Sequence, residues 1–252
     1  MNKYGIIGLI ILVAIVIGGA AYYISTQQAQ TTIPTTTTAT TPTSTVAPTT
    51  TTATSGLTPT EVEAIKYMAE EEKLALDVYS KLADIYPNVP VFTNIAKSES
   101  THVKAVLHLA EKYGIPISLG APGQFNNTHI QELYDQLIKE GSKGLEEALK
   151  VGALIEETDI KDLQEWIAKV QHEDIKQVFE CLMMGSRNHL RAFVLTLEKM
   201  FNTTYTPQII TQQEYEQIVN SPMETGTNNI CSDLGINLGA NATETPKGGS
   251  AK

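Results

Sequence analysis

The segment that decides the fold is TPTEVEAIKYMAEEEKLALDVYSKLADIYP, residues 58–87. Its first four residues, TPTE, form a capping box with proline at the first helical position, which predicts a helix that begins at Pro59. Apolar residues then recur at alternating spacings of three and four, and Pro87 opposes continuation of the helix. The segment therefore predicts one long amphipathic helix.

Three further segments show the same period, and they predict helices at about 91–113, 143–170 and 173–200. A shorter helix is expected near residues 129–140, and the box Thr211-Gln-Gln-Glu214 predicts a weak last helix. No segment alternates with the two-residue period of a strand. The predicted fold is therefore all-α, an antiparallel four-helix bundle over residues 59–200.

The N-terminal region, residues 1–25, contains the uncharged stretch GIIGLIILVAIVIGGAAYYI at 5–24. A helix of this length matches the hydrocarbon core of a bilayer, and Lys3 on its short side predicts a cytoplasmic N-terminus. The small residues at 18–21 leave a cleaved signal peptide as the alternative. The sequence predicts a single-pass membrane protein with an extracellular domain or, after cleavage, a secreted one.

Two other regions flank the predicted bundle. Residues 26–58 form a linker rich in threonine and proline, with sixteen threonines between 31 and 58. Residues 201–252 form a C-terminal extension that is predicted to be mostly disordered. Its Cys231 either pairs with Cys181 or leaves Cys181 as a buried free thiol.

Charge and motifs exclude several functions. The net charge is −10 and no Lys/Arg-rich run is present, which argues against nucleic acid as a partner. Between Pro59 and Met200 there are 23 acids and 15 bases, whereas the first 58 residues carry one charged side chain. Walker A, Gly-x-Gly-x-x-Gly and Gly-x-Ser-x-Gly patterns are absent, so nucleotide chemistry and a serine nucleophile have no support.

Each of the four apolar stripes is interrupted near its middle by polar residues, which are Glu72, then Glu99 and His102, then Glu156 and Asp159, and finally Ser186 and His189. A buried carboxylate is unfavourable unless something compensates it. Packing of long helices brings their middles to a similar height, so these groups are expected to converge. A metal ion would compensate several of them at once.

The candidate metal ligands are therefore Glu72, Glu99, His102, Glu156 and His189, with Asp159 as a sixth group. Carboxylate and imidazole donors suit iron or manganese, and zinc also accepts them. Glu70 or Glu71 could replace Glu72 as the inward residue, because a second stripe is nearly as regular. Asp159 is either a ligand or an acceptor that orients a ligating histidine.

Other polar residues have simpler interpretations. Tyr79, seven residues beyond Glu72, could line the cavity, but an ordinary core role is preferred for it, and Ser186 is expected to be a small residue at a helix contact. His108, His129 and His172 are expected at the surface.

Four blocks carry a resemblance to a known family: EEKLALDVY (71–79), FTNIAKSESTH (92–102), VGALIEETDIKDL (151–163) and GSRNHLRAF (185–193). Over about residues 60–200 the chain resembles the DUF2202 domain, an uncharacterised ferritin-like family. In ferritin-like di-iron bundles, one helix of each pair gives a Glu and the other a Glu-x-x-His. The resemblance assigns Glu72, Glu99 with His102, and Glu156 to this pattern. The fourth helix departs from it, because Ser186 stands where a glutamate would precede His189.

These observations support two functional hypotheses. The first is an exported, membrane-tethered bundle that binds iron or manganese and oxidises the metal or reduces oxygen or peroxide; no catalytic side chain is assigned. The second is a cell-surface interaction module without metal, whose inward acids bind Arg187, Arg191, tyrosine or histidine. The expected partners are a metal ion and, through residues 5–24, the membrane. The oligomeric state is left open, with a dimer as one option.

Overall fold

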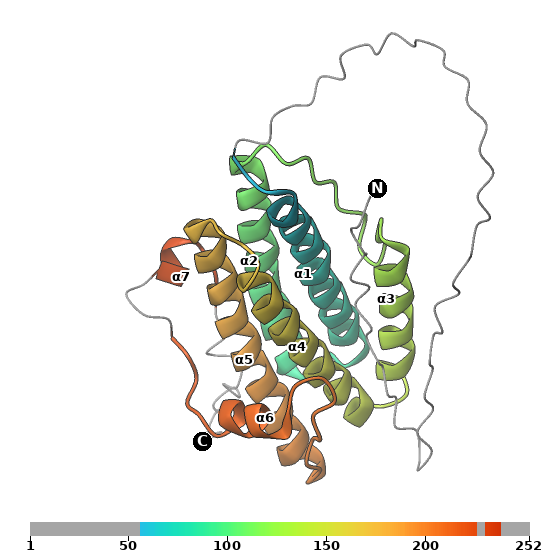
Figure 1. The fold of residues 1–252 in the computed structure, drawn as a ribbon. Coiled ribbons are helices and arrows are strands. Elements are labelled where there is room, and N and C mark those ends of the chain that lie inside the picture. The colour runs from blue at the N-terminus through green and yellow to red at the C-terminus, as the bar shows by residue number, and fades with distance from the viewer. Residues whose placement is uncertain (1–55, 226–229, 238–252) are drawn as a thin grey trace, which may run out of the picture. The chain divides into compact units, whose positions relative to one another are not determined.

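The computed structural model describes residues 56–225 and 230–237, and all regular elements in this part of the chain are helices (Figure 1). In chain order they are α1 (Pro59–Ile85), α2 (Pro90–Lys112), α3 (Thr128–Gly141), α4 (Leu145–Ile167), α5 (Glu173–Phe201), α6 (Gln212–Val219) and α7 (Ile230–Asp233). The all-α prediction is confirmed for these residues. The six predicted helices are all present, with ends within three residues of those expected.

The predicted membrane segment and most of the predicted linker, residues 1–55, lie outside the described residues. Within the part that is described, none of the helices is both long enough and apolar enough to cross a bilayer.

The four long helices form two hairpins that pack against each other. Helices α1 and α2 pair closely, as do α4 and α5, and further contacts join α1 to α4 and α2 to α5. Helix α3 contacts both α1 and α4, and it brings the chain back so that α4 starts at the same end of the bundle as α2 (Figure 1). All four stripes therefore face one common core.

The core contains large apolar side chains from every long helix, including Met68, Leu82, Phe92, Ile95, Leu149, Leu163, Phe179 and Phe193, each less than 2% exposed. The rings of Tyr79, Phe193 and Phe92 pack in sequence, with centroids 5.1 and 5.7 Å apart. Gly152 on α4 permits this arrangement, because a Cβ atom there would lie 2.5 Å from the Phe193 ring.

Glu61 joins the start of α1 to the start of α5. Its carboxylate accepts hydrogen bonds from the backbone N–H and the hydroxyl of Thr58, which confirms the predicted capping box. It also accepts from the backbone N–H groups of Gln171 and His172 and lies 2.7 Å from Nδ1 of His172. His172, expected at the surface, is thus half-buried against Glu61. Burial raises the pKa of Glu61, but these hydrogen bonds outweigh it and hold the pKa below its usual value.

Replacement of Glu61 by glutamine is expected to lower the free energy of unfolding by about 1–3 kcal/mol at about pH 7, because a charged acceptor of several hydrogen bonds is lost. A depressed folded pKa means that this contribution is complete above the ordinary pKa of 4.5 and is lost as the pH falls below it. Urea unfolding of wild type and Glu61→Gln should therefore differ most above about pH 5 and converge in acid.

The matched control is Glu63→Gln, since Glu63 is exposed on the same helix. It should unfold like wild type at every pH. An equal loss of stability in both variants would show that the loss comes from the change in helix charge and not from the hydrogen bonds between Glu61 and the start of α5.

In the described part of the C-terminal extension, residues 201–225 and 230–237, α6 and α7 pack on α5, and other residues contact α4 and α2. Thr211 caps α6 as predicted, and Tyr215 and Ile218 of α6 are buried. Further along, Cys231 in α7 forms a disulfide with Cys181 of α5. The extension was expected to be mostly disordered, and the two helices within it were only partly anticipated. Residues 226–229 and 238–252 lie outside the described residues.

Candidate metal centre

All six predicted ligands lie in the interior at the middle of the bundle. Five of them are at most 2% exposed and Asp159 is 6% exposed. They come from all four long helices: Glu72 from α1, Glu99 and His102 from α2, Glu156 and Asp159 from α4, and His189 from α5. The expected convergence of the stripe interruptions is therefore what the structure shows.

Five of these residues form two ligand triads that share Glu99. In the first triad, Nδ1 of His102 lies 2.8 Å from Oε2 of Glu99 and 3.2 Å from Oε2 of Glu72. In the second triad, Nδ1 of His189 lies 2.7 Å from Oε1 of Glu99 and 3.5 Å from Oε2 of Glu156. Within each triad one donor atom per residue lies within 4.8 Å of the others, so each could hold a metal ion. The two oxygens of Glu99 face one triad each.

Several buried polar atoms at this site have no hydrogen-bond partner among the described residues, namely Oε1 of Glu72, Oδ1 of Asp159 and Nδ1 of His189. The Nδ1 atom of His189 is close to two carboxylate oxygens without hydrogen-bond geometry. Unpaired buried groups are unfavourable, and convergent lone pairs are the arrangement that a cation requires. The donor set and its unsatisfied atoms therefore fit a metal ion.

The electrostatics of the five triad residues point the same way. Burial raises the pKa of Glu72 to about 7 and also raises that of Glu156. For Glu99, burial is outweighed by the two imidazoles, so its pKa lies below the usual range. Burial lowers the pKa of His102 and His189, but the carboxylates outweigh it and raise both, to about 9 for His189. The raised pKa values of two carboxylates and both imidazoles reflect a buried site that favours bound positive charge.

Asp159 lies beside the triads without belonging to either. Its Oδ2 accepts a hydrogen bond from the hydroxyl of Ser186, the residue that replaces the expected fourth-helix glutamate. Burial and the nearby charge of Glu72 raise its pKa well above the usual range. Ser186, three residues before His189, thus binds a carboxylate of α4 and does not supply one itself.

Tyr79 lines the site, which goes beyond the core role predicted for it. Its hydroxyl donates a hydrogen bond of 2.5 Å to Oε1 of Glu156 and lies 3.3 Å from the carbonyl oxygen of Gly152. The signal was present in the sequence, because Tyr79 lies two helical turns beyond Glu72 on the same stripe. Through its hydrogen bond, Tyr79 of α1 orients the carboxylate of Glu156.

The alternatives to Glu72 lie elsewhere. Glu71 is buried, but its pKa is raised by burial and then by Asp162, away from both triads. Glu70 is half-buried and accepts a hydrogen bond from the backbone of Asn127. Glu72 is thus the residue of α1 that belongs to a triad. His108 is exposed as predicted, and the side chain of His129 lies outside what the structure describes.

Arg187 and Arg191 do not reach the inward acids. Both bind the carboxylate of Glu224 in the C-terminal extension, Arg187 at 2.6 and 2.8 Å and Arg191 at 3.0 Å. Arg191 also donates to the carbonyl of Ile218. The arginine part of the metal-free hypothesis is therefore wrong for the described residues.

The backbone of α5 approaches His102 closely at Gly185. A Cβ atom at this position would lie 2.6 Å from Cε1 and 2.7 Å from Nε2 of the His102 ring. Any larger residue must displace the imidazole. The sequence did not indicate this role for Gly185, because the side chain that packs against a helical glycine belongs to another segment and cannot be identified from local spacing.

The fold and the site together define an all-helical bundle protein with buried carboxylate and histidine clusters that could hold metal ions. Residues 61–222 match the model of DUF2202, described as an uncharacterized protein domain. The chain is 49% identical over 170 residues to the uncharacterized protein MJ0754 of Methanocaldococcus jannaschii, which covers 67% of this chain and 91% of that protein. A crystal structure of the hypothetical protein MJ0754 is 44% identical, with a TM-score of 0.63, and covers 74% of this chain and 100% of its own. The chain therefore belongs to the DUF2202 family.

Proposed function

We propose that this protein is a ferritin-like metal-binding bundle that holds two redox-active metal ions, iron or manganese, in the two triads. The observation that supports this most directly is the sharing of Glu99, whose two carboxylate oxygens face His102 and His189 separately. A carboxylate in this position suits a pair of ions bridged by one side chain. The unpaired atoms of Glu72 and His189 would complete the coordination.

The negative charge of the buried cluster supports metal ions, and not protons alone, as its natural occupants. Glu72, Glu99, Glu156 and Asp159 are all buried, and within the described residues the imidazoles among them are those of His102 and His189. Even with both imidazoles protonated, four ionised carboxylates would leave an excess of negative charge in the interior. Two divalent ions would offset that excess, and their binding would release the protons now held by the carboxylates.

Bound iron or manganese would supply one-electron chemistry with oxygen or peroxide. The protein's own residues would hold and shield the ions. Tyr79 orients Glu156, the Ser186 hydroxyl orients Asp159, and the triad side chains are almost entirely removed from solvent. The substitution of serine for a fourth-helix glutamate makes the two ion positions unequal, since a second shared carboxylate is absent from the described ligand set.

Metal analysis of the purified protein tests this proposal. After anaerobic loading with Fe(II) or Mn(II) and removal of excess ion, two ions per chain are expected, because the two triads are separate except for Glu99. His102→Ala should retain fewer ions, whereas His108→Ala, which alters an exposed histidine of the same helix, should match wild type. One ion per chain in wild type would contradict the proposal of two metal ions. Absence of bound ion would contradict metal binding itself and favour the metal-free interaction module.

We further propose that the bundle is exported and tethered to the membrane by residues 5–24, or secreted after cleavage. Support comes from the apolar N-terminal stretch, the threonine-rich linker and the Cys181–Cys231 disulfide, since disulfides persist in oxidising compartments. Fractionation of cells should recover the chain with the membrane or in the medium. Recovery in the cytosol would contradict export.

A further inference from the structure

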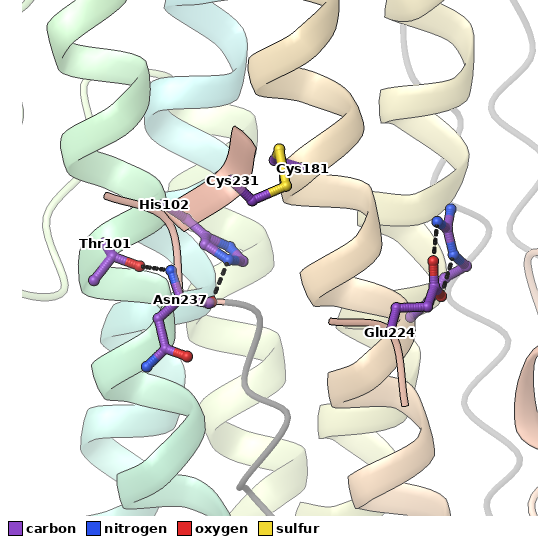
Figure 2. The surroundings of a disulfide bond; sticks show 7 residues. Thr101, His102, Cys181, Glu224, Cys231 and Asn237 are labelled. Atoms are coloured by element: carbon purple, nitrogen blue, oxygen red, sulfur yellow. Dashed lines mark hydrogen bonds and ion pairs between the residues drawn. A yellow bond between two sulfur atoms is a disulfide. The ribbon is translucent and has the colours of Figure 1, made fainter. Parts of the chain in front are cut away.

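The C-terminal strap, residues 230–237, lies directly against the candidate metal centre although it is distant in sequence. It contains α7, and it begins beyond residue 222, where the match to the family ends. Cys231 bonds to Cys181 of α5, and Cys231 and Ile236 are both buried in the apolar core cluster. Figure 2 shows that this places Asn237 beside His102.

One backbone carbonyl of the strap serves both histidines. The carbonyl oxygen of Asn237 lies 3.2 Å from Nε2 of His102. It also accepts a hydrogen bond from the hydroxyl of Ser98, and that hydroxyl oxygen lies 2.9 Å from Nε2 of His189. Two imidazoles from different hairpins are thus connected to one carbonyl oxygen, His102 directly and His189 through the Ser98 hydroxyl.

The chemistry of these groups fixes the proton positions. A carbonyl oxygen only accepts, so Nε2 of His102 must donate to it. The one proton of the Ser98 hydroxyl points to the same carbonyl, so the hydroxyl oxygen accepts from Nε2 of His189. With Nε2–H engaged on both rings, the Nδ1 atoms that face the triad carboxylates are the ones available to a metal.

We propose that the strap is a positioning device for the metal centre: the Asn237 carbonyl and Ser98 orient the two ligating imidazoles, and the Cys181–Cys231 disulfide holds that carbonyl in place. The inference rests on the proposed function where it concerns metal affinity. The orientation of the rings does not depend on a bound ion. Reduction of the disulfide would release the strap and weaken metal binding.

Two contacts besides the disulfide hold the strap near its end. The backbone N–H of Asn237 donates a 2.8 Å hydrogen bond to the hydroxyl of Thr101 (Figure 2), and that hydroxyl donates to the carbonyl of Ser98. The N–H of Ile236 donates to the carbonyl of Cys231 and closes the turn after α7. These contacts connect the disulfide to Asn237 within six residues of chain.

The first test uses metal-free protein with ¹⁵N-labelled histidine. In the oxidised protein, NMR should show two Nε2–H protons that exchange slowly with solvent, from His102 and His189. The exposed His108 serves as an internal control with rapid exchange. Reduction with a phosphine acts on a single bond, because both cysteines of the chain are in it, and it should accelerate exchange at both rings.

Two variants separate positioning from general stability. Ser98→Ala should lose the slow signal of His189 and keep that of His102, which a uniformly loosened fold would not do. Thr101→Val leaves the disulfide intact and should accelerate exchange at both rings, so it replaces reduction if the reduced protein unfolds. Slow signals that survive both reduction and Thr101→Val would overturn the proposal.

The second test measures Mn(II) affinity by competition with a chelator. Reduction and Ser98→Ala should each weaken binding by about 10–100-fold, the range typical for loss of partners that orient a ligating histidine. Equal affinity of oxidised and reduced folded protein would also overturn the proposal. Absence of any binding by the oxidised protein would instead refute the proposed function, and the NMR comparison would still decide whether the strap orients the rings.

Discussion

Glu99→Gln is expected to abolish retention of both metal ions. Glutamine has nearly the same volume, so the packing of the bundle should be preserved. The change removes the only carboxylate within the described residues that belongs to both triads. It also removes the charge that contacts His102 at 2.8 Å and His189 at 2.7 Å. Any other single ligand substitution should leave one triad intact.

Thermal unfolding provides the measurement. At free ion of about 100 times Kd, a bound ion adds about 2.7 kcal/mol of stability, which corresponds to roughly 5–10 °C in Tm for a domain of this size. A chelator should therefore lower the Tm of wild type by at least that amount and leave Glu99→Gln unchanged. Glu111→Gln, an exposed substitution on the same helix, should respond like wild type. A chelation effect that persists in Glu99→Gln would place the ions elsewhere.

Gly185→Ala is expected to have the second largest effect. The new methyl group would lie 2.6–2.7 Å from the His102 ring, which is buried and has little room to move. Displacement of the ring would separate Nδ1 from Glu72 and Glu99. We expect metal affinity at this triad to fall by about 10–100-fold, as for other losses of histidine orientation.

Gly141→Ala is the control, because its methyl group would lie 2.8 Å from a side-chain carbon of Leu82 and contact neither triad. Overpacking there should lower the free energy of unfolding by about 1–3 kcal/mol, offset in part by the higher helix propensity of alanine. Metal stoichiometry should not change. Chelator competition together with urea unfolding distinguishes the two substitutions. If both glycines affect only stability, the close approach of α5 to His102 does not control the site.

The helices and the ligand set could be predicted from the sequence because both depend on local periodicity. The start of α1 follows from the four residues of its capping box. The inward positions of Glu72, Glu99 and His189 follow from the three-and-four spacing of apolar residues within each segment. A carboxylate on an apolar stripe must face the interior, whatever its partner. Convergence then follows from the similar length of the four helices.

The remaining features depend on distances between segments, which periodicity does not report. Asn237 contributes a backbone carbonyl, so nothing about its side chain signals the contact with His102. Ser98 is next to Glu99 in sequence, but its role appears only when α5 supplies His189. The pairing of Cys181 with Cys231 could not be decided because the sequence is compatible with a disulfide and with a buried free thiol. These contacts required the packed structure.

The disulfide has a consequence for how the chain responds to cleavage. Cys181 and Cys231 are 50 residues apart, so α6 and the connection that follows it lie inside a covalently closed ring. A protease that cuts the backbone anywhere within this ring opens it without separating the two pieces. The N-terminal and C-terminal fragments would travel together through purification and come apart only in the presence of a thiol, so damage to this region would be invisible on a non-reducing gel.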